Sequence, residues 1–214
     1  MRGQYDARGR AASYLRTSAG NGILRRGLLA YAAGALRHGT AMNDPTHRDT
    51  FLQGRTALVT GSTSGIGLAI ATALAAAGSK VAINGLGTPE QVASAIATVD
   101  AAGNGGTRHF GADLRDADAI AAMMADLDAW SNGGIDILVN NAGIQHAVPL
   151  HEMPVSRWND IIAVNLSSAF HTMRAAMPAM AARGYGRVVN IASVHGLVAS
   201  KDKAPYVASK FGIV

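Results

Sequence analysis

The sequence contains no cysteine among its 214 residues. This absence excludes disulfides, thiolate metal sites and a cysteine nucleophile, and it favours a reducing compartment. Charged residues make up 15% of the chain and hydrophobic residues 49%, which excludes a coiled coil and a disordered chain. The longest uncharged apolar stretch, residues 65–78, is shorter than the ~20 residues that a membrane helix needs. We therefore expect a globular, cytoplasmic protein without a membrane-spanning segment.

The basic charge is confined to the first fifty residues. They hold eight arginines against three aspartates and account for the net charge of +5, so residues 51–214 are neutral. A neutral domain gives no reason to expect a nucleic-acid partner. We predict a disordered basic extension over residues 1–50, with a targeting segment or a surface-binding arm as alternatives. Met42 is an alternative first residue of the protein.

After Arg55, short β-branched runs alternate with alanine-rich stretches of helical period. This pattern predicts an α/β fold, a doubly wound parallel-sheet Rossmann fold over residues 51–214. The expected strands are Ala57–Thr60, Val81–Asn84, Thr107–Gly111, Ile135–Asn140 and Arg187–Ile191. The expected helices are Ser64–Ala77, Pro89–Ala102, Asp116–Trp130 and Val155–Ala182, with a last helix that begins near residues 204–206.

Only five strands can be found, whereas a sheet of this kind has about six. We therefore expect the fold to be incomplete at the C-terminus, and the 214-residue chain to show little activity alone. The fifth strand would then be an edge that exposes Val188, Val189 and Ile191.

The first strand leads into a glycine-rich turn, Gly61-Ser62-Thr63-Ser64-Gly65-Ile66-Gly67, and then into a helix. Gly61 permits the tight turn, Gly65 lets the backbone approach a pyrophosphate, and Gly67 lets helix and strand pack closely. The turn therefore predicts a dinucleotide site. The second strand ends in Asn84-Gly85, without an acid for a ribose hydroxyl or an arginine for a 2′-phosphate, and NAD is favoured over NADP.

Tyr206 and Lys210 lie four residues apart, so they share one face of the expected last helix. A free phenol ionises near pH 10, and a cation ~4 Å away could stabilise the phenolate enough for proton exchange at neutral pH. Two further polar segments close the preceding strands, Asn140-Asn141-Ala142-Gly143 and Asn190-Ile191-Ala192-Ser193.

Together with the glycine loop, these segments resemble the short-chain dehydrogenase/reductase family from about residue 55 to residue 214. The resemblance implies that Tyr206 is the acid/base, that Ser193 hydrogen-bonds the reacting oxygen, and that Asn165 positions a water. Lys210 would hold the nicotinamide ribose. The family's cofactor contacts correspond to Tyr206 and Lys210 and to Gly61, Thr63, Ser64, Gly65, Ile66, Gly67, Asp113, Leu114, Asn141, Ala142 and Gly143. Asn140 is expected to tie the sheet together.

Within this family, residues 140–146 and 192–200 resemble the enzymes that oxidise D-3-hydroxybutyrate. In those enzymes a glutamine, a histidine and a lysine bind the substrate carboxylate, and they match Gln145, His195 and Lys203. With Ser193 and Tyr206 they would form the substrate site. The resemblance thus implies interconversion of (R)-3-hydroxybutyrate and acetoacetate with NAD, in a homotetramer.

Two other interpretations stay open. One is an NADPH-dependent reductase of 3-oxoacyl thioesters from the same family, which would lack the carboxylate-binding residues. The other is a non-catalytic dinucleotide-binding fragment. His146, His151 and Glu152 lie close together in the sequence but lack the spacing of a metal motif, so no metal is expected.

Overall fold

A computed structural model describes residues 50–214. The predicted basic extension falls almost wholly on residues 1–49, which lie outside this range. The described residues form a parallel sheet in the order β3-β2-β1-β4-β5. Its strands are β1 Thr56–Val59, β2 Lys80–Ile83, β3 Arg108–His109, β4 Ile137–Asn140 and β5 Arg187–Asn190. The chain winds outward from β1 in one direction and then in the other, which confirms the doubly wound Rossmann arrangement.

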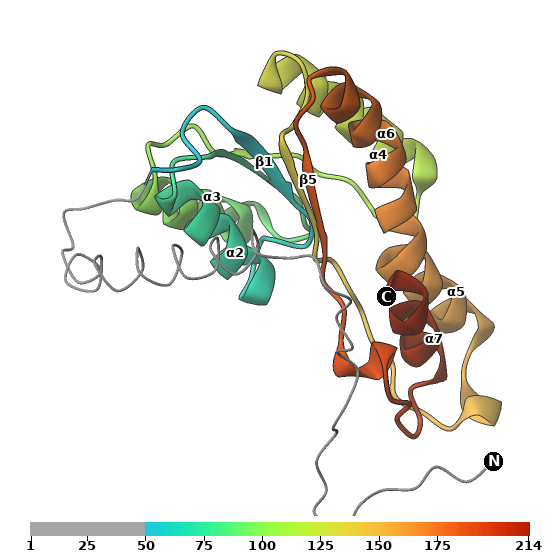
Figure 1. Cartoon of the computed structure of the whole chain (residues 1–214). Coiled ribbons are helices and arrows are strands. Elements are labelled where there is room, and N and C mark those ends of the chain that lie inside the picture. The colour runs from blue at the N-terminus through green and yellow to red at the C-terminus, as the bar shows by residue number, and fades with distance from the viewer. Residues whose placement is uncertain (1–49) are drawn as a thin grey trace, which may run out of the picture. The chain divides into compact units, whose positions relative to one another are not determined.

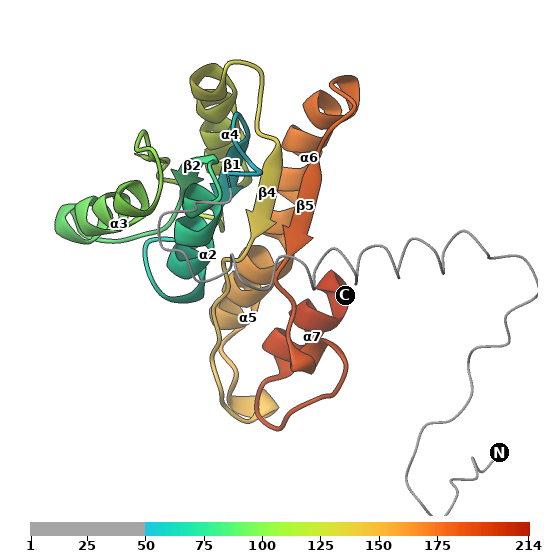
Figure 2. The same ribbon diagram turned by 60° about the vertical axis from the view of Figure 1, so that its left-hand side comes forward.

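Helices cover both faces of the sheet (Figure 1, Figure 2). The helices α2 Gly65–Ala76 and α3 Pro89–Ala102 pack on one face, and α4 Ala117–Ser131 and α6 Ser168–Ala182 on the other. Successive strand residues point to opposite faces, so the two faces have separate cores. Val59, Ile83 and Val139 lie in one core, and Leu58, Ala82 and Leu138 lie in the other.

Two further helices lie side by side near the carboxyl ends of the strands (Figure 2). They are α5 Val155–Ile162 and α7 Ala204–Ile213, and α7 begins where the sequence predicted. Short 3₁₀ turns, Leu150–Glu152 and Val194–Gly196, follow β4 and β5. Loops at this end of a parallel sheet are where ligands bind in folds of this type.

The prediction of one continuous helix over Val155–Ala182 is wrong. A π-helical turn, Ala163–Ser167, separates α5 from α6. An extra residue in a turn rotates the side chains that follow, and such turns are frequent at functional sites. Hydrophobic periodicity cannot reveal the turn because the apolar residues on both sides still recur at helical spacing. The third strand is also shorter than predicted, with two residues.

The strand β5 is an edge of the described sheet, since it pairs only with β4. Val188 and Val189 are 36% and 46% exposed, which confirms the predicted open edge. Ile191 differs from the prediction because it is half-buried against the core beside α2. Within the described part of the chain, no helix is long and apolar enough to span a membrane.

Candidate active site

The glycine-rich turn after β1 has the backbone geometry that the sequence predicted. Gly61 and Gly65 adopt positive φ angles of 60° and 57°, which favour glycine. A Cβ on Gly67 would lie 2.3 Å from the Gly61 carbonyl oxygen and 2.5 Å from Asn141 Nδ2, whereas one on Gly65 would meet nothing within 4 Å. Gly67 therefore permits close packing, and Gly65 leaves the backbone open at the start of α2.

The turns after β1 and β4 are joined by a compact set of hydrogen bonds. The hydroxyl of Thr60 accepts from the backbone N–H groups of Asn141 and Ala142 at 3.0 and 3.1 Å. Asn141 Nδ2 donates back to the Thr60 and Gly61 carbonyls at 2.9 and 3.1 Å. These bonds fix the separation between the glycine turn and the segment that follows β4.

Asn140 has the structural role that the sequence predicted. Its Nδ2 donates to Asn190 Oδ1 at 2.9 Å, and its Oδ1 accepts from the Thr172 hydroxyl at 2.7 Å. It thereby links β4 to β5 and to α6.

A cavity of about 610 Å³ lies against these turns. Its volume is within the range of small-molecule and cofactor sites. Of the predicted cofactor residues, all except Gly65, Tyr206 and Lys210 line it. The walls that sequence reasoning predicted are Gly61, Thr63, Ser64, Ile66, Gly67, Asp113, Leu114, Asn141, Ala142 and Gly143. The close-packed Gly67, the open Gly65 and this cavity together fit a dinucleotide whose pyrophosphate faces the start of α2.

Asn84 directly follows β2 and is fully buried, and its side chain hydrogen-bonds to backbone groups of the protein interior. Its Nδ2 donates to the carbonyls of Phe110 and Ala112 at 2.9 and 3.4 Å, so it ties β2 to the segment after β3. The cavity wall beyond it consists of Gly85 and Leu86. This end of β2 therefore offers neither an acid nor a cation to a ribose.

Sequence reasoning missed an ion-pair network on the cavity wall. Arg115 Nε and Nη2 donate to both carboxylate oxygens of Asp113, with the shortest distance 2.5 Å, and Nη1 lies 3.7 Å from Asp160 on α5. The guanidinium hydrogen bonds lower the pKa of Asp113 from 3.8 to about 2. The sequence signal was the position of Arg115, two residues after Asp113.

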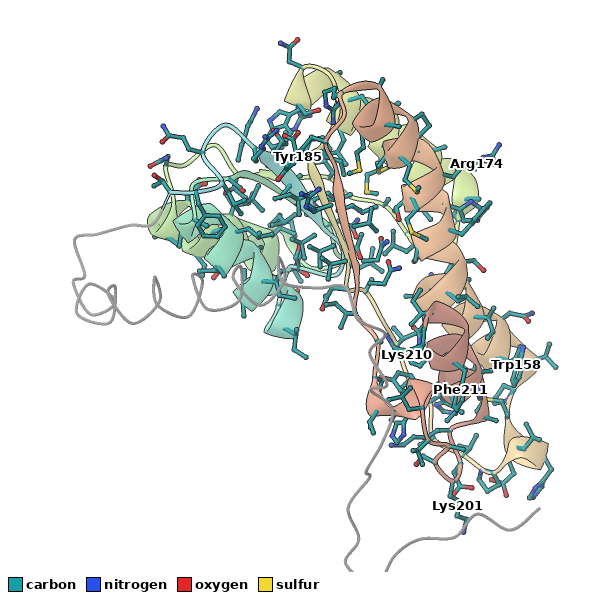
Figure 3. All side chains as sticks on the ribbon, viewed as in Figure 1. Trp158, Arg174, Tyr185, Lys201, Lys210 and Phe211 are labelled. Carbon is teal, nitrogen blue, oxygen red and sulfur yellow. The ribbon has the colours of Figure 1, made fainter. Side chains whose placement is uncertain are left out.

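Lys210 and Tyr206 share a face of α7, as the spacing predicted, and Figure 3 shows Lys210 beside the carboxyl end of β5. Lys210 is 4% exposed, and its Nζ donates to the Ile191 carbonyl at 2.6 Å. The same nitrogen lies 5.8 Å from the centre of the Tyr206 ring. Burial lowers the pKa of the Lys210 ammonium, because desolvation disfavours its charged form.

Three predicted substrate residues, Lys203, His195 and Tyr206, lie close together at the start of α7. Lys203 Nζ lies 3.5 Å from His195 Nε2, and the rings of His195 and Tyr206 meet edge to face at 6.0 Å. His195 Nδ1 lies 3.3 Å from the Val198 carbonyl, which can only accept, so Nδ1 carries the hydrogen and Nε2 accepts from Lys203. Ser193 joins this group, since its hydroxyl accepts from the His195 backbone N–H at 3.2 Å.

Asn165, in the π-helical turn, connects the cavity to α7. Its Oδ1 accepts from the Ile144 backbone N–H at 2.8 Å, and its Nδ2 donates to the Ile144 carbonyl at 2.9 Å and to Ser209 Oγ at 3.2 Å. Ile144 lines the cavity, and Ser209 directly precedes Lys210. Asn165 thus holds the cavity wall and α7 together.

The remaining predicted substrate residue, Gln145, is not joined to the others among the residues that the structure describes. Gln145 is exposed in the loop after β4, and no hydrogen bond described for residues 50–214 joins it to His195 or Lys203. His151 and Glu152 lie 3.5 Å apart at the surface. Within the same residues, no group of three or more histidine and acidic side chains gathers to hold a metal ion.

Comparisons with known proteins place the chain in a family. The family model described as "short chain dehydrogenase" matches residues 55–214. D-beta-hydroxybutyrate dehydrogenase from Rhizobium meliloti (strain 1021) is 51% identical over 160 residues, which are 75% of this chain and 62% of that protein. The enzyme of the same name from Cupriavidus necator is 52% identical over 164 residues, covering 76% of this chain and 62% of that enzyme.

A solved structure of a metagenomic short-chain oxidoreductase in complex with NADP is 39% identical, with a TM-score of 0.71. The match covers 76% of this chain and 72% of that chain. The chain spans 62% of the length of the two curated relatives that it matches.

Proposed function

The chain belongs to the short-chain dehydrogenase/reductase family of oxidoreductases, and we propose that it interconverts (R)-3-hydroxybutyrate and acetoacetate with NAD. The observation that carries the proposal is the contact between Lys203 and His195 beside Tyr206. It places a lysine ammonium and an imidazole next to the expected acid/base. A small 3-oxo acid needs such an arrangement, because its carboxylate lies only a few bonds from its reacting carbonyl.

Tyr206 acts as the acid/base in this proposal. In oxidation its phenolate removes the proton of the substrate hydroxyl, and in reduction its phenol returns a proton to the carbonyl oxygen. Ser193 Oγ donates a hydrogen bond to the same oxygen and fixes its position. Bound NAD supplies the hydride acceptor for oxidation, and its reduced form the donor for reduction.

Lys210 is the cation beside Tyr206 in this proposal, with its ammonium 5.8 Å from the centre of the phenol ring. Its ammonium already donates to the Ile191 carbonyl, which aims the side chain at the end of β5. Its remaining hydrogens are available for the cofactor ribose, and Asn165 would place a water that continues the proton path.

Lys203 donates to the substrate carboxylate in this proposal, and His195, whose ring nitrogens are engaged by Val198 and Lys203, positions the Lys203 ammonium. The Lys203 ammonium has three hydrogens, so it can donate to His195 Nε2 and to a carboxylate at once. Gln145, in the loop after β4, would donate its amide N–H to the same carboxylate.

Three features support NAD over NADP. The end of β2 offers Gly85 and Leu86 rather than a cation that could bind a 2′-phosphate. The cavity arginines Arg115 and Arg157 both lie within ion-pair distance of carboxylates. The two curated relatives share the name of a free-acid dehydrogenase, whereas the structural neighbour with bound NADP is less similar in sequence.

Substitution of the carboxylate-binding pair tests the substrate assignment. In the full-length protein, we expect Lys203→Ala to raise KM for (R)-3-hydroxybutyrate about tenfold or more, because a charge-assisted hydrogen bond is lost. The KM for NAD should not change. Lys201→Ala is the matched control, since Lys201 is an exposed lysine of the same loop.

A KM for the free acid that Lys203→Ala leaves unchanged would contradict the substrate site. Preference for a 3-oxoacyl thioester and NADPH would replace the proposal with the reductase alternative. A homotetramer and a cytoplasmic location are part of the proposal and rest on the family alone.

A further inference from the structure

The Arg115 guanidinium lines the cavity and lies close to two carboxylates. One edge of its guanidinium donates to Asp113, and the opposite nitrogen Nη1 faces Asp160 across the cavity wall. With its Nε–Nη2 edge engaged by Asp113 and Nη1 close to Asp160, the group can still offer its two flat faces to a ligand. The side chain remains 49% exposed and lines the cavity.

The sheet order defines which half of the cavity Arg115 borders. The glycine turn follows β1 in the centre of the sheet, Ser193 and Tyr206 follow β5 at one edge, and Arg115 follows β3 at the other edge. A dinucleotide whose pyrophosphate lies at the central turn extends one arm toward each edge. The arm on the side of Arg115 is therefore the one away from the reacting groups.

We propose that a flat face of the Arg115 guanidinium is a stacking platform for the adenine base of the cofactor. The inference rests on the proposed function only in taking an adenine dinucleotide as the ligand. A planar guanidinium stacks well on aromatic rings and is weakly hydrated. Asp113 and Asp160 come from two different segments of the chain, so they hold the plane in a fixed orientation before the base arrives and reduce the entropy lost on binding.

The network argues against a simple phosphate-binding role for Arg115. Its charge is already matched by Asp113, and Asp160, which also lies near Arg157, is 3.7 Å from Nη1. A bound anion would be repelled by both carboxylates. Stacking on the base leaves both ion pairs intact.

The test is a calorimetric titration with ADP-ribose, which contains the adenosine arm and lacks nicotinamide. We expect Arg115→Ala to weaken binding about tenfold. Arg115→Lys should weaken it nearly as much, since lysine keeps the charge and loses the plane. Arg174→Ala is the matched control, because Arg174 is exposed on α6 and does not line the cavity (Figure 3), and its affinity should equal that of the unaltered chain. Thermal unfolding of each variant verifies that it folds.

A second ligand distinguishes stacking on Arg115 from a hydrogen bond between the adenine amino group and Asp113. The hypoxanthine counterpart of ADP-ribose lacks the amino group that Asp113 could accept from, but keeps the flat ring. Stacking predicts the same fold-loss in Arg115→Ala for both ligands. A loss of affinity in Arg115→Ala that disappears with the hypoxanthine ligand would overturn stacking. Binding of ADP-ribose by Arg115→Ala or Arg115→Lys within twofold of the unaltered chain would overturn it too.

The result is independent of the substrate assignment. If the unaltered chain binds ADP-ribose and the full-length protein fails to oxidise 3-hydroxybutyrate, the proposed function fails and the role of Arg115 is still decided by the variants. If the unaltered chain binds no ADP-ribose, both are contradicted.

Discussion

The side chains of this site are held by partners that also decide what they can bind. His195 is held as the Nδ1–H tautomer by the Val198 carbonyl, which leaves Nε2 to accept from Lys203. Lys210 is buried and aimed by a single carbonyl. At the opposite side of the cavity, Asp113 is held by Arg115. Each functional group thus has a defined direction before any ligand arrives.

The Asp113–Arg115 pair predicts a specific acid titration. The pKa of Asp113 is lowered from 3.8 to about 2, first by the side-chain hydrogen bonds of Arg115. The stabilisation from this pair is therefore present above about pH 3.8 and is lost as the pH falls through about 2. Both side chains are more than a third exposed, so the effect on stability is small.

Carboxyl ¹³C chemical shifts measured by NMR against pH provide the check. The Asp113 midpoint should lie near pH 2 in the unaltered chain and should move toward 3.8 in Arg115→Ala. An unchanged midpoint in the variant would show that Arg115 is not the cause. The Asp118 carboxyl, which is not bound to Arg115, is the internal reference.

At the scale of elements, the site depends on how closely the chain turns approach one another. The turn after β1 contacts the turn after β4 through Thr60 and Asn141, and the π-helical turn reaches both Ile144 and α7 through Asn165. The second of these contacts exists because the extra residue of the π turn directs Asn165 inward. A regular helix over residues 155–182 would give this position a different direction.

Gly67→Ala tests the close approach of α2 to the β4 turn. The added methyl group would lie within 2.5 Å of the Gly61 carbonyl and the Asn141 amide, and both belong to hydrogen-bonded turns that yield little. We expect the free energy of unfolding to fall by about 1–3 kcal/mol, more than the helix propensity of alanine restores. Urea unfolding measures this change.

The control is Gly111→Ala, whose Cβ would meet only His109, at an ordinary contact distance of 3.4 Å. Its unfolding free energy should stay within about 0.5 kcal/mol of the unaltered value. An equally small change in the unfolding free energy of Gly67→Ala would contradict the close packing of α2 against the turn after β4.

At the scale of the whole molecule, the sequence was sufficient for the architecture. Strand order, the parallel sheet and the start of α7 follow from alternating strand and helix patterns, and the glycine turn follows from its place between β1 and α2. The residues joined by long-range side-chain contacts were not predictable. The Asp160 contact with Arg115 spans 45 positions of the chain, and no local pattern relates them. The same holds for the inward orientation of Asn84, whose partners Phe110 and Ala112 lie 26 and 28 positions further along the chain.

The two proposed roles lie on opposite sides of the sheet centre. The proposed adenosine side is built by segments after β2 and β3, and the proposed reacting side by segments after β4 and β5. The glycine turn lies between them. This division explains why the cavity includes most predicted cofactor residues but not Tyr206, His195 or Lys203.

The measurement that tests the account most directly is the initial rate of NADH formation by the full-length protein from (R)-3-hydroxybutyrate. The (S) enantiomer, NADP and a Tyr206→Phe variant are the controls. The account predicts turnover only with the (R) acid and NAD, and a fall in kcat of about 10²- to 10⁴-fold for Tyr206→Phe. Turnover of a 3-oxoacyl thioester with NADPH, together with no oxidation of the free acid, would contradict it.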